Sequence, residues 1–231
     1  MAVTVDNAVA RVSNDGGSAV TSGSFDVAAG DLLVVCGNAD QLNDSTVDVL
    51  LISDNQTPDL AWVAGPIRGA SDSGAGLVAS WYFHSAGAIS GLTVTLTAGV
   101  SNDSPSIKVY KCTGHDSADI LGAVNEGDLT TDPQTTTAIT SETAGAYFAA
   151  WTDWNQTGTP TSSDLTESGF DTSGDISGAS GYKAIGSASE SVTGNMNSGG
   201  TPAGNWICFE IRAAAGAGGT ILPQMMEHHG A

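Results

Sequence analysis

The sequence predicts an all-β protein that folds as a two-sheet antiparallel β-sandwich. Short runs of β-branched and aromatic residues are separated by turns rich in Gly, Ser, Asn and Pro, which is typical of such proteins. The 231 residues include 30 glycines and only 13% are charged, so the residues that build exposed helices are scarce. No stretch of helical period is long enough to require a helix, although residues 117–121 fit a single turn.

The first half of the chain carries the clearest strand signals. Residues 1–18 are expected to form an extended N-terminal arm or edge strands. Residues 20–27 then lead through a Gly-Asp turn into an apolar run at residues 32–36. Because that run contains no polar residue, we expect it to be buried on both faces. Further strands are predicted at residues 47–52, 60–67, 77–84, 92–97 and 107–112.

The second half repeats this strand order more loosely. Residues 180–188 and 206–212 resemble residues 79–87 and 106–112, which lie about 100 positions earlier. We therefore expect two pseudo-repeated halves within one sandwich at residues 19–212, because either half alone would leave an apolar sheet face uncovered. Chance similarity between strands rich in Ser, Thr and Gly is the alternative explanation. The other matched pairs are residues 145–151 with 30–36 and residues 192–196 with 92–96.

The charge composition excludes several classes of partner. The chain has 25 acidic and 6 basic residues, which gives a formal net charge of −19. So few basic residues cannot form a phosphate-binding stripe, and a surface this acidic is repelled by anionic lipids. We therefore expect neither nucleic acid nor a membrane as a partner. Three cysteines are too few for a disulfide framework, and the N-terminus lacks the pattern of a signal peptide.

No catalytic residue is predicted. The sequence has no nucleophile elbow, no phosphate-binding loop and no zinc-protease spacing, so we expect a protein that is not an enzyme. A hydrolase whose carboxylates come together only in the folded chain is the alternative. Cys112 and His115 have the spacing of half a metal site, but no second pair exists, so no metal and no cofactor are expected. Calcium bound by loop aspartates is a weaker alternative, because no Asp-x-Asp-x-Asp-Gly loop is present.

Aromatic residues suggest a second function. Trp154 and Tyr182 are the candidates for a ligand surface, on which they and nearby aspartates would bind sugar. The alternative hypothesis is therefore a carbohydrate-binding or adhesive β-sandwich module. The other tryptophans fall in apolar strands, where core packing is expected: Trp62, Trp81, Trp151 and Trp206.

The C-terminal end has the composition of a docking segment. Residues 213–219 form a linker of Gly and Ala, and a tail follows at residues 220–231. Met side chains adapt to varied surfaces, and an Ile-Leu-Pro segment can bind to a groove or sheet edge of a neighbour. We expect this tail to serve assembly through Ile221, Leu222, Pro223, Met225 and Met226.

The strand pattern as a whole resembles a known family. Residues 24–35, 60–63, 78–83, 91–96 and 107–110 together resemble the jelly-roll β-sandwich modules of tailed-bacteriophage virion proteins and of some bacterial surface proteins. The resemblance covers roughly residues 20–212 and brings no enzymatic residues. It implies a sandwich of jelly-roll type and a structural protein of a bacteriophage virion, made in the host cytoplasm. The implied roles are an outer capsid decoration and a neck or tail-associated subunit.

The expected partners follow from this resemblance. A subunit of this kind would assemble through its sandwich edges and terminal segments with the major capsid protein or with neck and tail subunits. It would also form a homo-oligomer, such as a trimer. Electrostatic contacts between subunits would have to use the few basic residues near equivalent strands of the two halves, namely Lys108, Lys111, Lys183 and Arg212.

Overall fold

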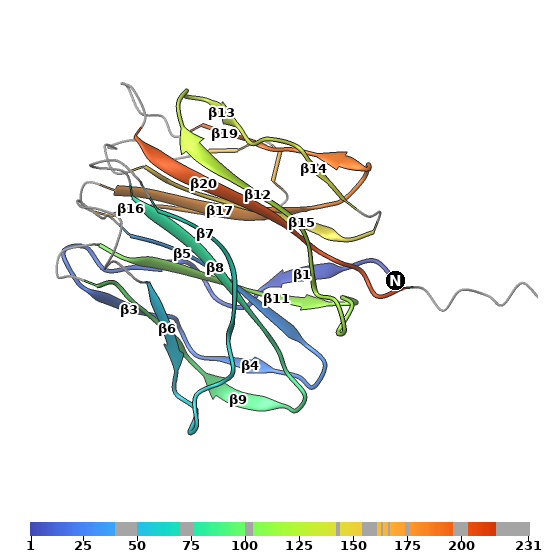
Figure 1. Cartoon of the computed structure of the whole chain (residues 1–231). Coiled ribbons are helices and arrows are strands. Elements are labelled where there is room, and N and C mark those ends of the chain that lie inside the picture. Colours follow the sequence, from blue (N-terminus) through green and yellow to red (C-terminus); the bar gives the residue numbers. More distant parts are fainter. Residues whose placement is uncertain are drawn as a thin grey trace, which may run out of the picture.

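In a computed structural model of the chain, the described residues form β-strands joined by turns and loops (Figure 1). No helix occurs among the residues that the structure describes, which confirms the prediction of an all-β fold. The described residues are 1–39, 50–69, 76–99, 104–141, 144–153, 161–162, 164–165, 167–173, 176–195 and 203–215.

Two antiparallel sheets lie at the centre of the molecule, one from each half of the chain (Figure 1). The first central sheet has the strand order β1 (Thr4–Asn7), β11 (Ser106–Thr113), β5 (Leu32–Ala39), β8 (Leu77–His84) and β7 (Val63–Arg68), and β2 (Val12–Ser13) also pairs with β11. The second central sheet has the order β12 (Leu121–Leu129), β20 (Gly204–Ile211), β15 (Ala146–Asp153), β17 (Ile176–Ala184) and β16 (Glu167–Ser173).

Short strands cover the outer face of each central sheet. On the first sheet lie β3 (Ala19–Thr21), β10 (Val94–Thr97) and β6 (Leu51–Asp54), with the pair β4 (Phe25–Val27) and β9 (Ile89–Leu92). On the second lie two pairs, β13 (Gln134–Thr135) with β19 (Thr193–Gly194), and β14 (Ile139–Thr140) with β18 (Ser189–Glu190). The described residues therefore form four layers and three hydrophobic cores, one between each pair of adjacent layers (Figure 1).

Strand β5 shows how the sequence produces this layering. Successive side chains of a strand point to opposite faces, so an apolar residue at every position serves two cores. Leu33 and Val35 point into the core beneath the outer strands of the first half, whereas Leu32 and Val34 point into the central core. All four side chains are fully buried. The prediction that residues 32–36 are buried on both faces is confirmed.

The central core fastens the two halves to each other. Phe148 on β15 stacks on Phe209 on β20, with ring centroids 5.4 Å apart and ring planes 8° apart. Tyr110 on β11 of the first half meets Phe148 edge-on at 5.4 Å. The Tyr110 hydroxyl also shares a 3.0 Å hydrogen bond with the Ser180 hydroxyl on β17. Both apolar packing and a buried polar contact therefore cross the boundary between the halves.

The number of layers differs from the prediction. The sequence predicted one sandwich of two sheets, whereas each half forms its own pair of layers and the two pairs are stacked. The short outer strands account for the difference, because four of those in the second half have only two residues each. Strands that short leave no periodic pattern in a sequence. The coarser prediction, a sandwich of antiparallel sheets, is confirmed.

Candidate interaction surface

One side of the molecule carries exposed apolar residues on two edge strands. β7 ends the first central sheet, β12 ends the second, and the two strands are in contact. Val63 and Ile67 on β7 are 47% and 44% exposed, and Val124 on β12 is 50% exposed. Met1 and Leu51 are the other large hydrophobic residues that are strongly exposed in the described part of the chain. We call the surface around Val63, Ile67 and Val124 the β7–β12 surface.

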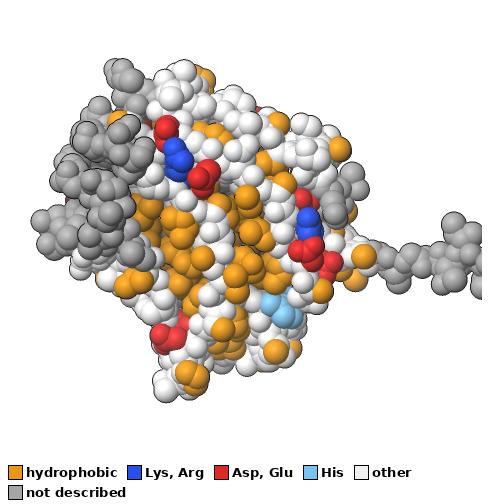
Figure 2. Space-filling view, viewed as in Figure 1, with side chains coloured by type: hydrophobic (Ala, Val, Ile, Leu, Met, Phe, Trp, Pro, Cys, Tyr) orange, Lys and Arg blue, Asp and Glu red, His pale blue; other side chains and the backbone are white. Residues whose placement is uncertain are grey.

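Ion pairs flank this surface. Arg68, the last residue of β7, lies 2.7 Å from the Asp128 carboxylate and 3.5 Å from that of Glu126, both on β12. The hydrogen bonds that Arg68 donates to the Asp128 carboxylate are the main reason why the pKa of Arg68 is raised. Near the start of β12, Arg212 pairs with Asp119. Figure 2 shows apolar side chains across the middle of this face, between two cationic side chains that each lie beside acidic ones. The apolar surface is thus bordered by charges that are already paired.

The two edge strands are poorly suited to accept another strand. Pro66 interrupts β7 and has no N–H to donate, and the pairing of β7 with β8 shifts register between Ala64 and Ile67. The pairing of β12 with β20 shifts between Leu121 and Val124. Proline and such irregularities are features by which proteins prevent edge-to-edge pairing. The β7–β12 surface therefore offers side chains to a partner in preference to backbone hydrogen bonds.

The basic residues that the sequence suggested for subunit contacts are bonded within the chain. Lys183 Nζ lies 2.7 Å from the Glu190 carboxylate, and Lys111 Nζ lies 3.9 Å from that of Asp31. Burial acts to raise the pKa of Glu190, but the Lys183 ammonium and two backbone amides lower it overall. Lys108 is buried and donates to a backbone carbonyl oxygen at 3.0 Å. These cations already bond to groups within the chain. We therefore expect contacts between copies to use apolar residues instead.

Of the two predicted ligand residues, Tyr182 lies within the described structure. Tyr182 is half-buried, donates its hydroxyl hydrogen to the Val5 carbonyl oxygen at 2.9 Å, and packs edge-on against Tyr110. Its ring is therefore part of the central core. Trp154 and the tail residues Ile221, Leu222, Pro223, Met225 and Met226 lie outside the described residues.

The tryptophans predicted for the core are placed as expected, with one variation. Trp81, Trp151 and Trp206 are buried. Trp62 is half-buried against the core of the first half, where its indole Nε1 donates to the Asp54 carboxylate at 2.8 Å. Apolar strands predicted these positions correctly, because a large ring contributes much of the area that a sheet buries.

Cys112 and His115 do not converge on a metal position. Cys112 is fully buried in the central core, whereas His115 points toward His84. In the described part of the chain, no group of three or more His, Cys, Asp or Glu side chains is arranged to hold a metal ion. The thiols are also poor nucleophiles, since burial raises the pKa of Cys112 and raises that of Cys36 to about 12.

The sequence did not predict the residues of the β7–β12 surface. Val63 and Ile67 fell inside a predicted strand at residues 60–67, with nothing to show that their side chains were exposed. Pro66 is the available signal, because proline within a strand pattern marks an edge strand. Val124 had no such signal, since β12 was not predicted as a strand.

The described residues contain no helix that could cross a membrane. Comparison of the chain with models of known protein families, with curated proteins and with solved structures found no match.

Proposed function

We propose that this chain is a non-enzymatic structural protein of a bacteriophage virion, either an outer capsid decoration or a neck or tail-associated subunit. The observation that carries the proposal is the β7–β12 surface, where apolar side chains are exposed between paired charges. Contiguous apolar residues with a polar rim are typical of surfaces that contact another protein. The chain would be made in the host cytoplasm and would act as part of the particle.

The strand order supports a jelly roll in each half. In the first half the pairs are nested from the ends inward: β1 pairs with β11, β3 with β10, β4 with β9, and β5 with β8. This nested pairing is the order of a jelly roll, an architecture found in viral capsid and lectin domains. The second half has the corresponding pairs β12 with β20, β13 with β19, β14 with β18, and β15 with β17. We therefore propose two pseudo-repeated jelly rolls that pack through their larger sheets.

The charge supports a position outside the packaged DNA. A net charge of −19 would repel the phosphate backbone, so such a chain is better placed on the outer side of a capsid shell or in the neck or tail. Acidic loops also keep an exposed particle surface soluble. The proposed partners are the major capsid protein or neck and tail subunits, together with further copies of this chain in a homo-oligomer such as a trimer.

Mass spectrometry of purified particles tests the proposal. Particles of the phage that carries the gene are purified on a density gradient, and their peptides are quantified against those of the major capsid protein. We expect peptides of this chain at a constant ratio to the capsid protein across the particle peak, and antibody labelling of intact particles. If the chain is absent from the peak and found only in the lysate, the proposal is wrong.

A further inference from the structure

The tail and the β7–β12 surface match in chemistry. Residues 216–226 contain no charged side chain, in a chain with 25 acidic residues, and Glu227 is the first charge of the tail. Such a segment can approach the acidic body without repulsion. Contact between the apolar tail residues and Val63, Ile67 and Val124 would remove the apolar surface of both from water, which is favourable.

The form of the surface limits how a peptide could bind. Pro66 and the register shifts in β7 and β12 oppose the addition of a strand. A tail that contains Pro223 is also a poor strand, because proline cannot donate to a ladder. Both partners therefore favour contact through side chains, for which the unbranched Met225 and Met226 are suited.

The length of the linker favours a tail from another copy. Phe209, which pairs with Val124, lies six positions before Ala215, the last residue that the structure describes, and Ile221 lies six positions after it. At about 3.3 Å per residue each span is at most roughly 20 Å. The chain's own tail would have to reverse direction after Ala215 before Ile221 reached Val124. The tail of a neighbouring copy needs no such reversal.

We propose that residues 220–226 of a second copy of this chain bind to the β7–β12 surface through their apolar side chains. The inference rests on the proposed function, since it names one partner of that assembly. Because tail and surface are different parts of the molecule, the contact is heterologous: each copy gives one tail and receives another. Contacts of this kind build rings or open chains of subunits.

Sedimentation of full-length variants tests this contact. The Val124→Asp variant places a charge on the surface, and the Leu222→Asp variant places one on the tail. Leu51→Asp is the matched control, because Leu51 is 58% exposed on β6, away from the β7–β12 surface. We expect the wild type and the control to form species heavier than the 23.1 kDa monomer as concentration rises. Each of the other two variants should sediment as a monomer.

Mixing the two defective variants gives the sharpest outcome. The Val124→Asp chain keeps its tail and the Leu222→Asp chain keeps its surface, so an equimolar mixture should recover a dimer and nothing larger. A mixture that stays monomeric, a Leu222→Asp chain that assembles like the wild type, or a wild type that is monomeric at its highest soluble concentration would each overturn the inference. Ile67→Asp repeats the surface test, and circular dichroism confirms that every variant is folded. None of these results depends on whether the chain occurs in virions.

Discussion

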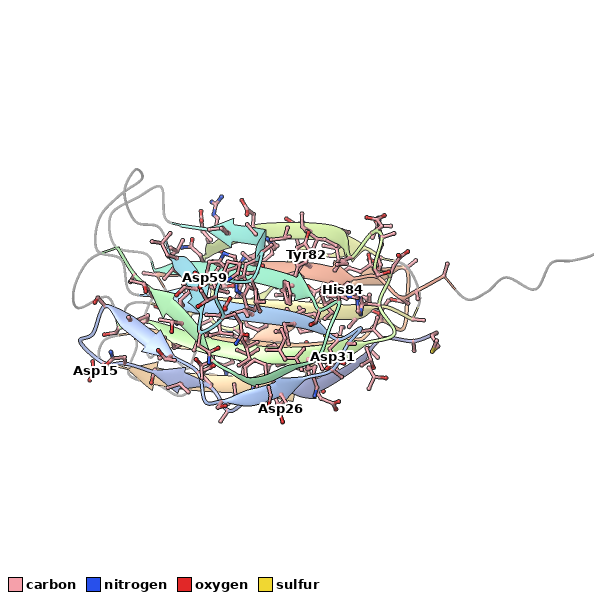
Figure 3. The ribbon with its side chains drawn as sticks, turned by 90° about the horizontal axis from the view of Figure 1, so that it is seen from below. Asp15, Asp26, Asp31, Asp59, Tyr82 and His84 are labelled. Carbon is pink, nitrogen blue, oxygen red and sulfur yellow. The ribbon has the colours of Figure 1, made fainter. Side chains whose placement is uncertain are left out.

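The Nδ1 atom of His84 lies 2.9 Å from the Nε2 atom of His115, which is hydrogen-bond distance between the two imidazole rings. His84 stands at the end of β8, close to Asp31, the residue before β5 (Figure 3). His115 is buried in the turn after β11, where it pairs with Ala213 at the C-terminal end of the described chain. The hydrogen bond needs one N–H and one bare nitrogen, so it is lost when both rings are protonated.

The histidine pair predicts a dependence of stability on pH. Burial, and then the neighbouring His84, lower the pKa of His115 below its usual 6.5, although Asp116 and Asp31 act in the opposite direction. A lowered pKa means that the unfolded chain binds the proton more readily than the folded one. The stabilisation is therefore complete above pH 6.5 and is lost as the pH falls from there through the lower folded-state pKa.

Urea unfolding at a series of pH values between neutrality and mild acid measures this effect. We expect the free energy of unfolding of the wild type to fall with decreasing pH. The slope should be smaller in the His115→Asn variant, which cannot titrate. Equal slopes in the two proteins would show that this histidine contributes nothing to the pH dependence.

The close approach of β20 to β15 predicts a severe effect of a single methyl group. A Cβ at Gly204 would overlap the backbone carbonyl oxygen of Thr152, and backbone atoms cannot turn aside as a side chain can. The Gly204→Ala variant should lose about 1–3 kcal/mol or more of unfolding free energy. Gly87→Ala is the matched control, since nothing lies within 4 Å of its added Cβ, and it should change stability by less than about 0.5 kcal/mol. Similar unfolding midpoints for both variants would contradict the packing described here.

The shared central core predicts that the two halves unfold together. Phe148 is fully buried where the two central sheets meet, so the Phe148→Ala variant should lose about 3–5 kcal/mol. Val63→Ala, on the exposed surface, should change stability by less than about 0.5 kcal/mol. Calorimetry of the wild type should show one cooperative transition. Two separate transitions, with only one of them shifted by Phe148→Ala, would mean that the halves are energetically independent.

The first half could be predicted from the sequence far better than the second. Residues 77–84 were predicted and observed as a strand, and the strand predicted at residues 107–112 lies within the observed Ser106–Thr113. In both cases β-branched and aromatic residues fill a buried strand. Strand β17 was expected at residues 180–188 but occupies Ile176–Ala184. The first residues of this strand are mostly small, because neighbouring groups lie close to it. A Cβ at Gly178, for example, would meet the Asn38 side chain.

The candidate site could not be predicted, because exposure depends on tertiary neighbours. Leu121–Leu129 contains Gly, Asn, Glu and Asp, which are depleted in strands, yet it forms β12 by pairing with β20. Val63 and Ile67 are of residue types that are typical of buried strands. Only the position of β7 at the end of its sheet leaves their side chains exposed.

Cryo-electron microscopy of the assembled particle tests directly whether the β7–β12 surface is an assembly contact. We expect copies of this chain to lie outside the DNA-filled interior, with the β7–β12 surface of each copy covered by another chain. Particles in which the chain is present but this surface faces solvent in every copy would show that the surface has no role in assembly.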